Sequence, residues 1–150
     1  MSELAVRPGI PAMSDAAIEK VRRLEKRILT APQVPIETSH VFHAGLYART
    51  ICIPCGVMIT GALIKIATLL IVQGDAIVYL DGESVRLEGY NVLPASAGRK
   101  QAFVALAETH LTMIFATDAR TVEQAERAFT DEADRLGSRR DGNHITITGE

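Results

Sequence analysis

The sequence contains no tryptophan, and aromatic residues make up only 5% of it. A core built around large aromatic side chains is therefore excluded. Apolar residues nevertheless account for 47% of the 150 residues, which is enough for the core of one domain of ordinary size. That core must consist mainly of valine, isoleucine, leucine and alanine.

The sequence also lacks an excess of charge of either sign. Its formal net charge is −2 and its pI is about 6.1. No global positive potential exists to attract phosphate groups. We therefore expect no direct binding to nucleic acid and no attraction to anionic membranes.

No apolar run is long enough for a membrane span or a signal peptide. The longest run, Leu63 to Leu80, is interrupted by residues such as Lys65 and Asp75, whereas a span needs about 20 nearly uninterrupted apolar residues. The first residues hold no apolar stretch of signal-peptide length. We expect a soluble protein made in a cytoplasm and not secreted through a signal peptide.

Cysteine occurs only twice, as Cys52 and Cys55 in ICIPCG. The C-x-x-C spacing is typical of zinc and redox sites, but no second pair of cysteines or histidines follows at zinc-finger spacing. Pro54 and Gly56 indicate a turn between strands, where a thioredoxin-like site needs a helix. We predict that both cysteines are buried or half-buried thiols.

The two ends of the chain differ from its middle. Residues 1–13, which include RPGIPAM, predict an extended arm that can order against a partner. Residues 14–30 predict a helix, because Ser14 can cap it and apolar residues recur at helical spacing. The apolar stripe leaves open whether this helix packs on its own domain or on another protomer.

The C-terminal end repeats this arrangement of helix and polar segment. Residues 121–136 predict a helix with a capping box at Thr121 and Gln124. Residues 137–150 form a polar tail in which HITIT alternates like a short strand. Such a strand can add to the edge of another sheet, in the same chain or in a different one.

Residues 38–117 show the pattern of short strands separated by turns. Turn residues recur at Gly74–Asp75, Asp81–Gly82, Glu88–Gly89 and Ala97–Gly98. Several short strands at such spacing predict an all-β sandwich or barrel. The Asp-Gly pair in YLDGES is a strong hairpin signal.

The stretches IPCGVMITG and IVQGDAIVYLDGESVRLEGYNVLPASAG resemble the cupins, which are small jelly-roll barrels. Residues 31 to 125 are also similar to a narrower group of cupin-like (RmlC-like) proteins encoded by tailed phages and prophages. The resemblance implies a mainly β, cupin-like jelly-roll barrel flanked by an N-terminal and a C-terminal α-helix. It also implies metal-binding histidines at alternate positions of the strands, which point into the barrel.

The positions that the resemblance assigns to metal-binding histidines hold other residues in this chain. They are Ile64, Thr68, Leu106 and Phe115, with a further histidine region around Lys100 and Gln101. A metal needs at least three N, O or S ligands. We therefore predict no metal, no cofactor and a barrel filled by apolar side chains. A metal site that joins His40 or His43 to His110 remains an alternative.

The sequence offers no recognisable catalytic group either. Ser96 lies in PASAG, which is not the G-x-S-x-G nucleophile elbow, so we predict no catalytic residue. The candidates for contact with a small molecule, a carbohydrate or an anion at the barrel mouth are Tyr47, Tyr90, Arg99 and Lys100.

Residues 61–74, GALIKIATLLIVQG, predict a strand that is apolar on both faces, unlike a half-exposed strand. The residues expected inside the barrel are Ala62, Ile64, Ile66, Thr68 and Leu70. The residues expected outside are Leu63, Lys65, Ala67, Leu69 and Ile71. An uncovered apolar face tends to aggregate. We therefore predict a homo-oligomer, most simply a dimer, with the outer residues at its interface.

Together these patterns favour a non-enzymatic structural protein of a phage particle, such as a decoration, cement or tail-associated protein. It would act through protein–protein contacts with its own copies and with other virion proteins, first in the host cytoplasm and then in the virion. Two alternatives remain: a small-molecule or carbohydrate-binding module, and a cupin enzyme whose metal site lies at other residues.

Overall fold

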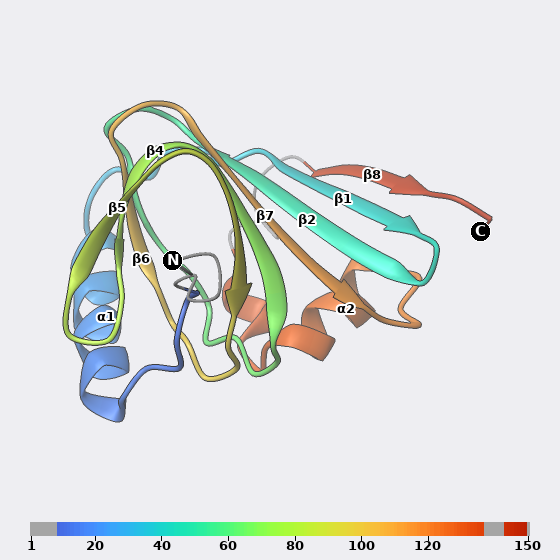
Figure 1. Cartoon of the computed structure of the whole chain (residues 1–150), viewed down its shortest axis with the longest axis horizontal. Coiled ribbons are helices and arrows are strands. Elements are labelled where there is room, and N and C mark those ends of the chain that lie inside the picture. Colours follow the sequence, from blue (N-terminus) through green and yellow to red (C-terminus); the bar gives the residue numbers. More distant parts are fainter. Residues whose placement is uncertain (1–8, 137–142, 150) are drawn as a thin grey trace, which may run out of the picture.

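A computed structural model describes residues 9–136 and 143–149. One curled sheet of eight strands forms most of the structure, and helices pack beside it (Figure 1). The strands are β1 Thr38–His43, β2 Leu46–Ile53, β3 Met58–Thr60, β4 Thr68–Tyr79, β5 Ser84–Ala95, β6 Ala102–Ala105, β7 Thr109–Ala116 and β8 Asn143–Ile147. The helices are α1 Asp15–Ile28, α2 Val122–Phe129 and the short 3-10 helix η2 Ala133–Arg135.

The strand order is β3-β6-β4-β7-β2-β1-β8, and β5 pairs with β4 along its whole length. The long strand β4 lies at the centre, because its first part pairs with β7 and its second part with β6. Pairing with both requires β4 to bend. The β4–β5 hairpin therefore arches over the core (Figure 1).

Two glycines permit this bend. The turns predicted at Gly74–Asp75 and Glu88–Gly89 are wrong, because both pairs lie inside the bent strands β4 and β5. Gly74 and Gly89 face each other inside β4 and β5, with φ angles of 144° and 77°. Glycine has no side chain, so it can adopt the backbone angles that a sharp bend in a strand requires. The predicted Asp81–Gly82 hairpin is confirmed, since the Leu80 N–H donates to the Glu83 carbonyl at 2.7 Å across it.

The predicted strand over residues 61–74 is wrong in its first half. The backbone before Thr68 forms only an isolated bridge between Ile64 and Arg99. The Leu63 N–H donates to the Glu132 carboxylate and the Lys65 N–H to the Phe129 carbonyl, both at 2.8 Å. The C-terminal segment therefore satisfies backbone donors that a neighbouring strand would otherwise satisfy.

Helix α1 packs on its own domain, as one of the two alternatives from the sequence predicts. The Ser14 hydroxyl caps it by accepting from the Ala17 N–H at 3.2 Å. Ala17 and Val21 are buried with Met13, and Tyr79 of β4 packs against this small cluster. Burial of this kind, rather than helix propensity, holds a helix of this length in place.

Helix α2 is shorter than predicted. It begins after Thr121, whose hydroxyl accepts from the Gln124 N–H at 3.1 Å, so the predicted N-cap is confirmed. The capping box is incomplete, because the Gln124 side chain accepts from the Arg120 N–H at 3.0 Å and not from that of Thr121. It ends at Phe129, because Thr130 has an extended backbone and its hydroxyl donates to the Leu63 carbonyl at 2.8 Å. Only the 3-10 turn of η2 follows within the predicted range.

Both terminal segments pair with the same chain where the structure describes them. Ile10 is buried and forms a parallel bridge with Ala95, while residues 1–8 of the predicted arm lie outside the described residues. The predicted HITIT strand is confirmed as β8, which adds in parallel to the edge strand β1. Residues 137–142 and 150 of the tail also lie outside the description.

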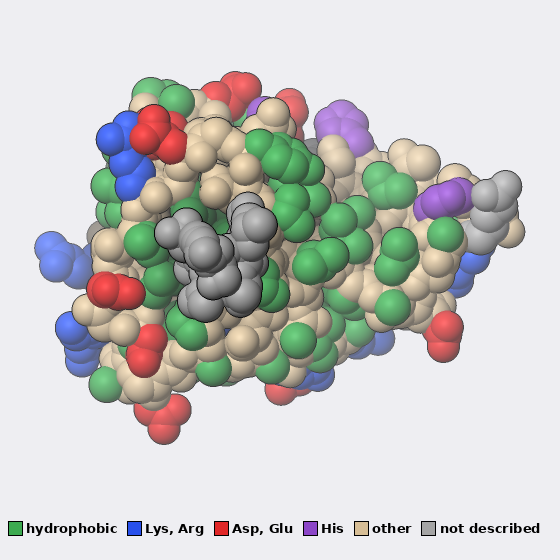
Figure 2. Space-filling model, viewed as in Figure 1, with side chains coloured by type: hydrophobic (Ala, Val, Ile, Leu, Met, Phe, Trp, Pro, Cys, Tyr) green, Lys and Arg blue, Asp and Glu red, His purple; other side chains and the backbone are tan. Residues whose placement is uncertain are grey.

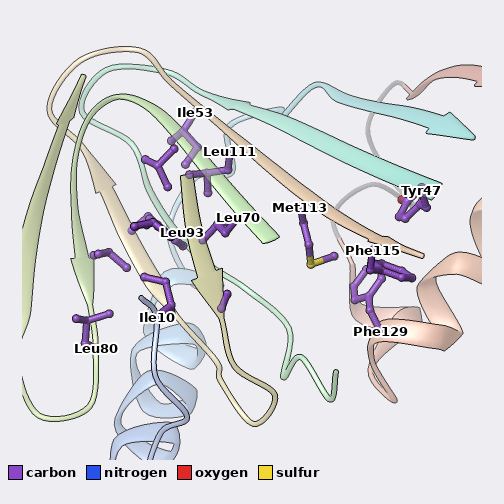
Figure 3. Close-up of a cluster of buried hydrophobic side chains, with 14 of the residues drawn as sticks. Ile10, Tyr47, Ile53, Leu70, Leu80, Leu93, Leu111, Met113, Phe115 and Phe129 are labelled. Atoms are coloured by element: carbon purple, nitrogen blue, oxygen red, sulfur yellow. The ribbon is translucent and has the colours of Figure 1, made fainter. Parts of the chain in front are cut away.

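The core lies on the concave face of the sheet (Figure 3). Aliphatic side chains dominate one end of it, and a small aromatic cluster of Tyr47, Phe115 and Phe129 occupies the other. None of the described helices combines the length and the apolar character that crossing a membrane requires.

Candidate functional site

A cavity of about 1010 Å³ opens between the concave face of the sheet, α1 and the segment around η2. Apolar side chains line it as the sequence predicts, but they do not fill it. Those from the sheet and the segments beside it include Ile51, Ile59, Ile64, Leu70, Phe103, Leu111 and Met113. A largely apolar cavity with a few convergent polar groups is typical of small-molecule sites.

Arg99 lies against this cavity and is only 2% exposed. Its Nη1 group donates to the Ser96 carbonyl at 2.7 Å, and its Nη2 group donates to Thr68 Oγ1 at 2.8 Å. Two longer contacts reach the Ile66 carbonyl at 3.4 Å and Met113 Sδ at 3.8 Å. No carboxylate of the described residues pairs with it.

Burial lowers the pKa of Arg99 to about 10. The guanidinium therefore remains protonated at neutral pH, although removal from water disfavours its charge. A buried charge is costly unless an opposite charge compensates it. The carbonyl, hydroxyl and sulfur acceptors around Arg99 supply only dipoles, so the cavity wall carries an uncompensated positive charge.

Gln101 adds a second polar group without a partner. It is 6% exposed and lines the same cavity, and its Nε2 finds no hydrogen-bond acceptor within the described part of the chain. Buried amide donors nearly always have one. Gln101 and Arg99 are separated by one residue in the segment that leads into β6. Both residues therefore bring hydrogen-bond donors to one part of the cavity wall.

Lys100, between them, is fully compensated. Its Nζ donates to Glu25 Oε2 at 3.1 Å and to the Gly61 carbonyl at 2.8 Å, and it lies 3.6 Å from Glu132 Oε1. Burial alone would raise the pKa of Glu132. Bonds from Arg22 and the Leu63 N–H, together with the charge of Lys100, outweigh burial and lower it to about 2.

The four predicted contact residues are not brought together. Arg99 and Lys100 lie at the cavity, but both are buried rather than placed at an exposed turn. Tyr47 is 0% exposed and its hydroxyl bonds to His40 Nδ1 at 2.7 Å, so it belongs to the core. Tyr90 is 66% exposed on β5 and does not line the cavity.

The positions that the resemblance assigns to histidines do not lie together at one site either. Ile64 lines the cavity, and Thr68 accepts from Arg99. Phe115 is buried in the aromatic cluster. Leu106 is 42% exposed, so the expectation that it fills the barrel is wrong. Leu106 lies in the connection between β6 and β7, where its N–H donates to the Asp75 carbonyl at 2.8 Å.

The alternative metal site at His40 or His43 with His110 does not form. His40 is buried beside Tyr47, whereas His43 is exposed and bonds through Nδ1 to Thr148 Oγ1 at 2.6 Å. His40 is in register with Arg49, and Arg49 with Met113, so His110 lies three residues further along β7. His110 instead approaches Cys52 and Glu108, a group that the sequence analysis did not identify.

The prediction for the cysteines is half right. Cys52 is half-buried on β2, whereas Cys55 is exposed in the turn that follows, and both are free thiols. The Cys55 thiol donates to the Leu106 carbonyl at 3.2 Å. The Pro54–Gly56 turn leaves Cys55 outside the sheet, which explains its exposure.

The predicted interface residues divide between two regions. Leu63, Lys65 and Ala67 precede β4, and Lys65 forms an ion pair with Asp131 at 2.7 Å. Leu69 and Ile71 lie on the convex face of the sheet, next to Pro94, Val92 and Ile114 on the neighbouring strands. Leu69 is 48% exposed. Hydrophobic side chains gather on the surface over β4 and β7 (Figure 2).

No protein-family model and no curated protein matches this sequence. Among solved structures, the salicylate 1,2-dioxygenase of Pseudoaminobacter salicylatoxidans is similar at 15% identity and a TM-score of 0.50, over 86% of this chain and 40% of that one. A cupin superfamily protein from Desulfitobacterium hafniense is similar at 18% identity and a TM-score of 0.47, over 59% of this chain and 83% of that one.

The cupin domain of Cnp3 from Schizosaccharomyces pombe is similar at 19% identity and a TM-score of 0.45, over 67% of this chain and 80% of that one. At such identities the comparisons bear on the fold alone. The predicted fold class, a mainly β cupin-like jelly roll flanked by helices, is confirmed by the curled sheet and its topology.

Proposed function

We propose that the cavity binds a small organic acid that has an apolar body, and that the chain acts by binding rather than by catalysis. The uncompensated charge of Arg99 at the wall of an apolar cavity is the observation that supports this function. A carboxylate accepts from a guanidinium in charge-assisted, often bidentate, hydrogen bonds. An anionic ligand would thus supply the missing counterion.

One contact of Arg99 is weak enough for a ligand carboxylate to replace it. Its bond to Met113 Sδ is long, at 3.8 Å, and sulfur is a weak acceptor. Met113 lines the cavity, so a ligand oxygen that displaces this contact would lie inside it. Gln101 Nε2, which has no acceptor, offers a further neutral donor to the same ligand. The apolar wall would hold the rest of the molecule.

Thermal-shift and calorimetric titration with a panel of aliphatic and aromatic carboxylates, each matched with its neutral amide, test this function. We expect acids to raise the melting temperature and amides not to do so. Arg99→Met should weaken acid binding roughly 10- to 100-fold, as loss of a charged hydrogen bond would. The variant should still fold, because an apolar side chain of similar length replaces a buried charge.

Arg86→Met is the matched control. Arg86 is an exposed arginine that pairs with Asp75 at 2.7 Å and does not line the cavity, so this variant should bind acids like the wild type. Equal binding of acids and amides would overturn the proposal. So would unchanged acid binding in Arg99→Met, or failure of every acid to bind.

We propose a structural role in a phage particle as the second candidate function. The resemblance to phage-encoded proteins motivates it, and the exposed apolar residues of the convex face, such as Leu69 and Val92, favour contacts with other copies or other virion proteins. Mass spectrometry of purified virions tests it. Absence of the chain from the particles would exclude this role and leave acid binding untouched.

A further inference from the structure

We propose that Cys52, Glu108 and His110 form a binding site for Zn²⁺ on the convex face of the sheet. The possible ligand atoms, Cys52 Sγ, a Glu108 carboxylate oxygen and a His110 ring nitrogen, all lie within 4.8 Å of one another. Within the described chain this is the one group of three or more such side chains that converges in this way.

Strand register brings the three residues together. Cys52 on β2 lies directly opposite His110 on β7 in the antiparallel pair. Glu108 directly precedes β7, and its carboxylate lies near Cys52 and His110. Within β7 successive side chains point to opposite faces. The intervening Thr109 and its partner Ile53 are both 0% exposed, so they point into the core. Cys52, Glu108 and His110 therefore share the outer face.

The chemistry of the three groups suits zinc. Thiolate sulfur, imidazole nitrogen and carboxylate oxygen are the usual ligands of Zn²⁺, at about 2.0–2.3 Å. Tetrahedral ligands at those bond lengths are about 3.5 Å apart, so the side chains need to approach only slightly. Glu108 and His110 are exposed, and exposed side chains exchange rotamers readily. Three protein ligands leave a fourth position for water or another ligand.

The charges around Cys52 favour a dication. The carboxylates of Glu108 and Glu37 both lie close enough to Cys52 to act electrostatically on its thiol. A bound Zn²⁺ would displace the thiol proton and neutralise these carboxylates.

This site is independent of the acid-binding cavity. None of its three residues lines the cavity. It also uses none of the positions that the family resemblance assigns to histidines. The two proposals can therefore fail separately, and Arg99→Met should bind zinc like the wild type.

Titration of the full chain with Zn²⁺ after EDTA treatment, followed by removal of the chelator, tests the proposal. We expect one Zn²⁺ per chain. Co²⁺ in its place should give a sulfur-to-metal charge-transfer band. Cys52→Ser and His110→Ala should each weaken zinc binding at least about tenfold, and Cys52→Ser should abolish the band. Circular dichroism would confirm that both variants remain folded.

Cys55→Ser and His43→Ala provide matched controls. Cys55 shares the C-x-x-C motif but bonds to the Leu106 carbonyl, and His43 is an exposed histidine near Thr148. Both controls should bind zinc like the wild type. The proposal would be overturned if the wild type bound no zinc, if the controls lost it, or if folded Cys52→Ser and His110→Ala retained it unchanged.

Discussion

At the scale of residues, two adjacent cations show how burial separates a structural role from a binding role. Lys100 reaches Glu25 and Glu132, so its charge is compensated within the chain. Among the residues that the structure describes, Arg99 reaches only a hydroxyl, two carbonyls and a thioether. Loss of Lys100 would take a cation away from Glu25 and Glu132, whereas Arg99 has no carboxylate partner among the described residues. Only the second arrangement favours an external anion.

Glu132 should make the protein sensitive to acid. Its pKa in the folded state is about 2, below the ordinary value of 4.5. A lowered pKa means that the ionised carboxylate stabilises the fold above pH 4.5 and that this stabilisation is lost as pH falls toward 2. We expect the urea unfolding free energy of the wild type to fall more steeply across that window than that of Glu132→Gln.

Asp131→Asn is the control for this pH experiment. Asp131 neighbours Glu132 in sequence, but its side chain is 84% exposed in the pair with Lys65. Exposed pairs contribute little to stability, so this variant should keep the steep pH dependence of the wild type. Parallel pH profiles for Glu132→Gln and the wild type would contradict the role given to Glu132.

At the scale of elements, the bend of β4 depends on Gly74. A Cβ at this position would lie 2.6 Å from Thr109 Oγ1 and 2.7 Å from the Glu108 carbonyl, at a φ of 144°. Any other residue would bring its Cβ too close to the Glu108 carbonyl and would have to adopt a φ angle that L-residues rarely adopt. The close approach of β4 to the start of β7 therefore requires glycine.

Gly74→Ala should consequently lower the unfolding free energy by roughly 2–4 kcal/mol, measured by urea denaturation. Gly61→Ala is the matched control. A Cβ there meets only the Gln101 carbonyl, at 3.8 Å, and no positive φ is required, so the change should stay within about 1 kcal/mol. Similar losses in the two variants would show that the bend does not demand glycine.

At the scale of the whole molecule, we predict self-association through the apolar residues of the convex face. Leu69 and Val92 are 48% and 47% exposed on neighbouring strands. We expect sedimentation analysis to show a dimer for the wild type and a monomer for Leu69→Lys, because a buried charge without a partner opposes association. Leu106→Lys, at a side chain 42% exposed outside the strands, should remain dimeric. A monomeric wild type would refute the predicted dimer.

The sequence by itself determined the features that depend on neighbouring residues. The caps at Ser14 and Thr121 and the hairpin at Asp81–Gly82 follow from local hydrogen bonds and backbone preferences, and they appear as predicted. The mainly β fold follows from the short strands separated by turn residues and from the family resemblance. Each of these signals lies within a few residues of the structure that it specifies.

Only the tertiary structure decided where distant residues meet. Whether Gly74 begins a turn or bends a strand depends on β7, and whether Arg99 is solvated depends on which elements cover it. The approach of Cys52 to Glu108 and His110 depends on the register of two strands far apart in the sequence. The cavity and the proposed metal site arise from such long-range packing, because burial and register are properties of the assembled sheet and not of any single segment.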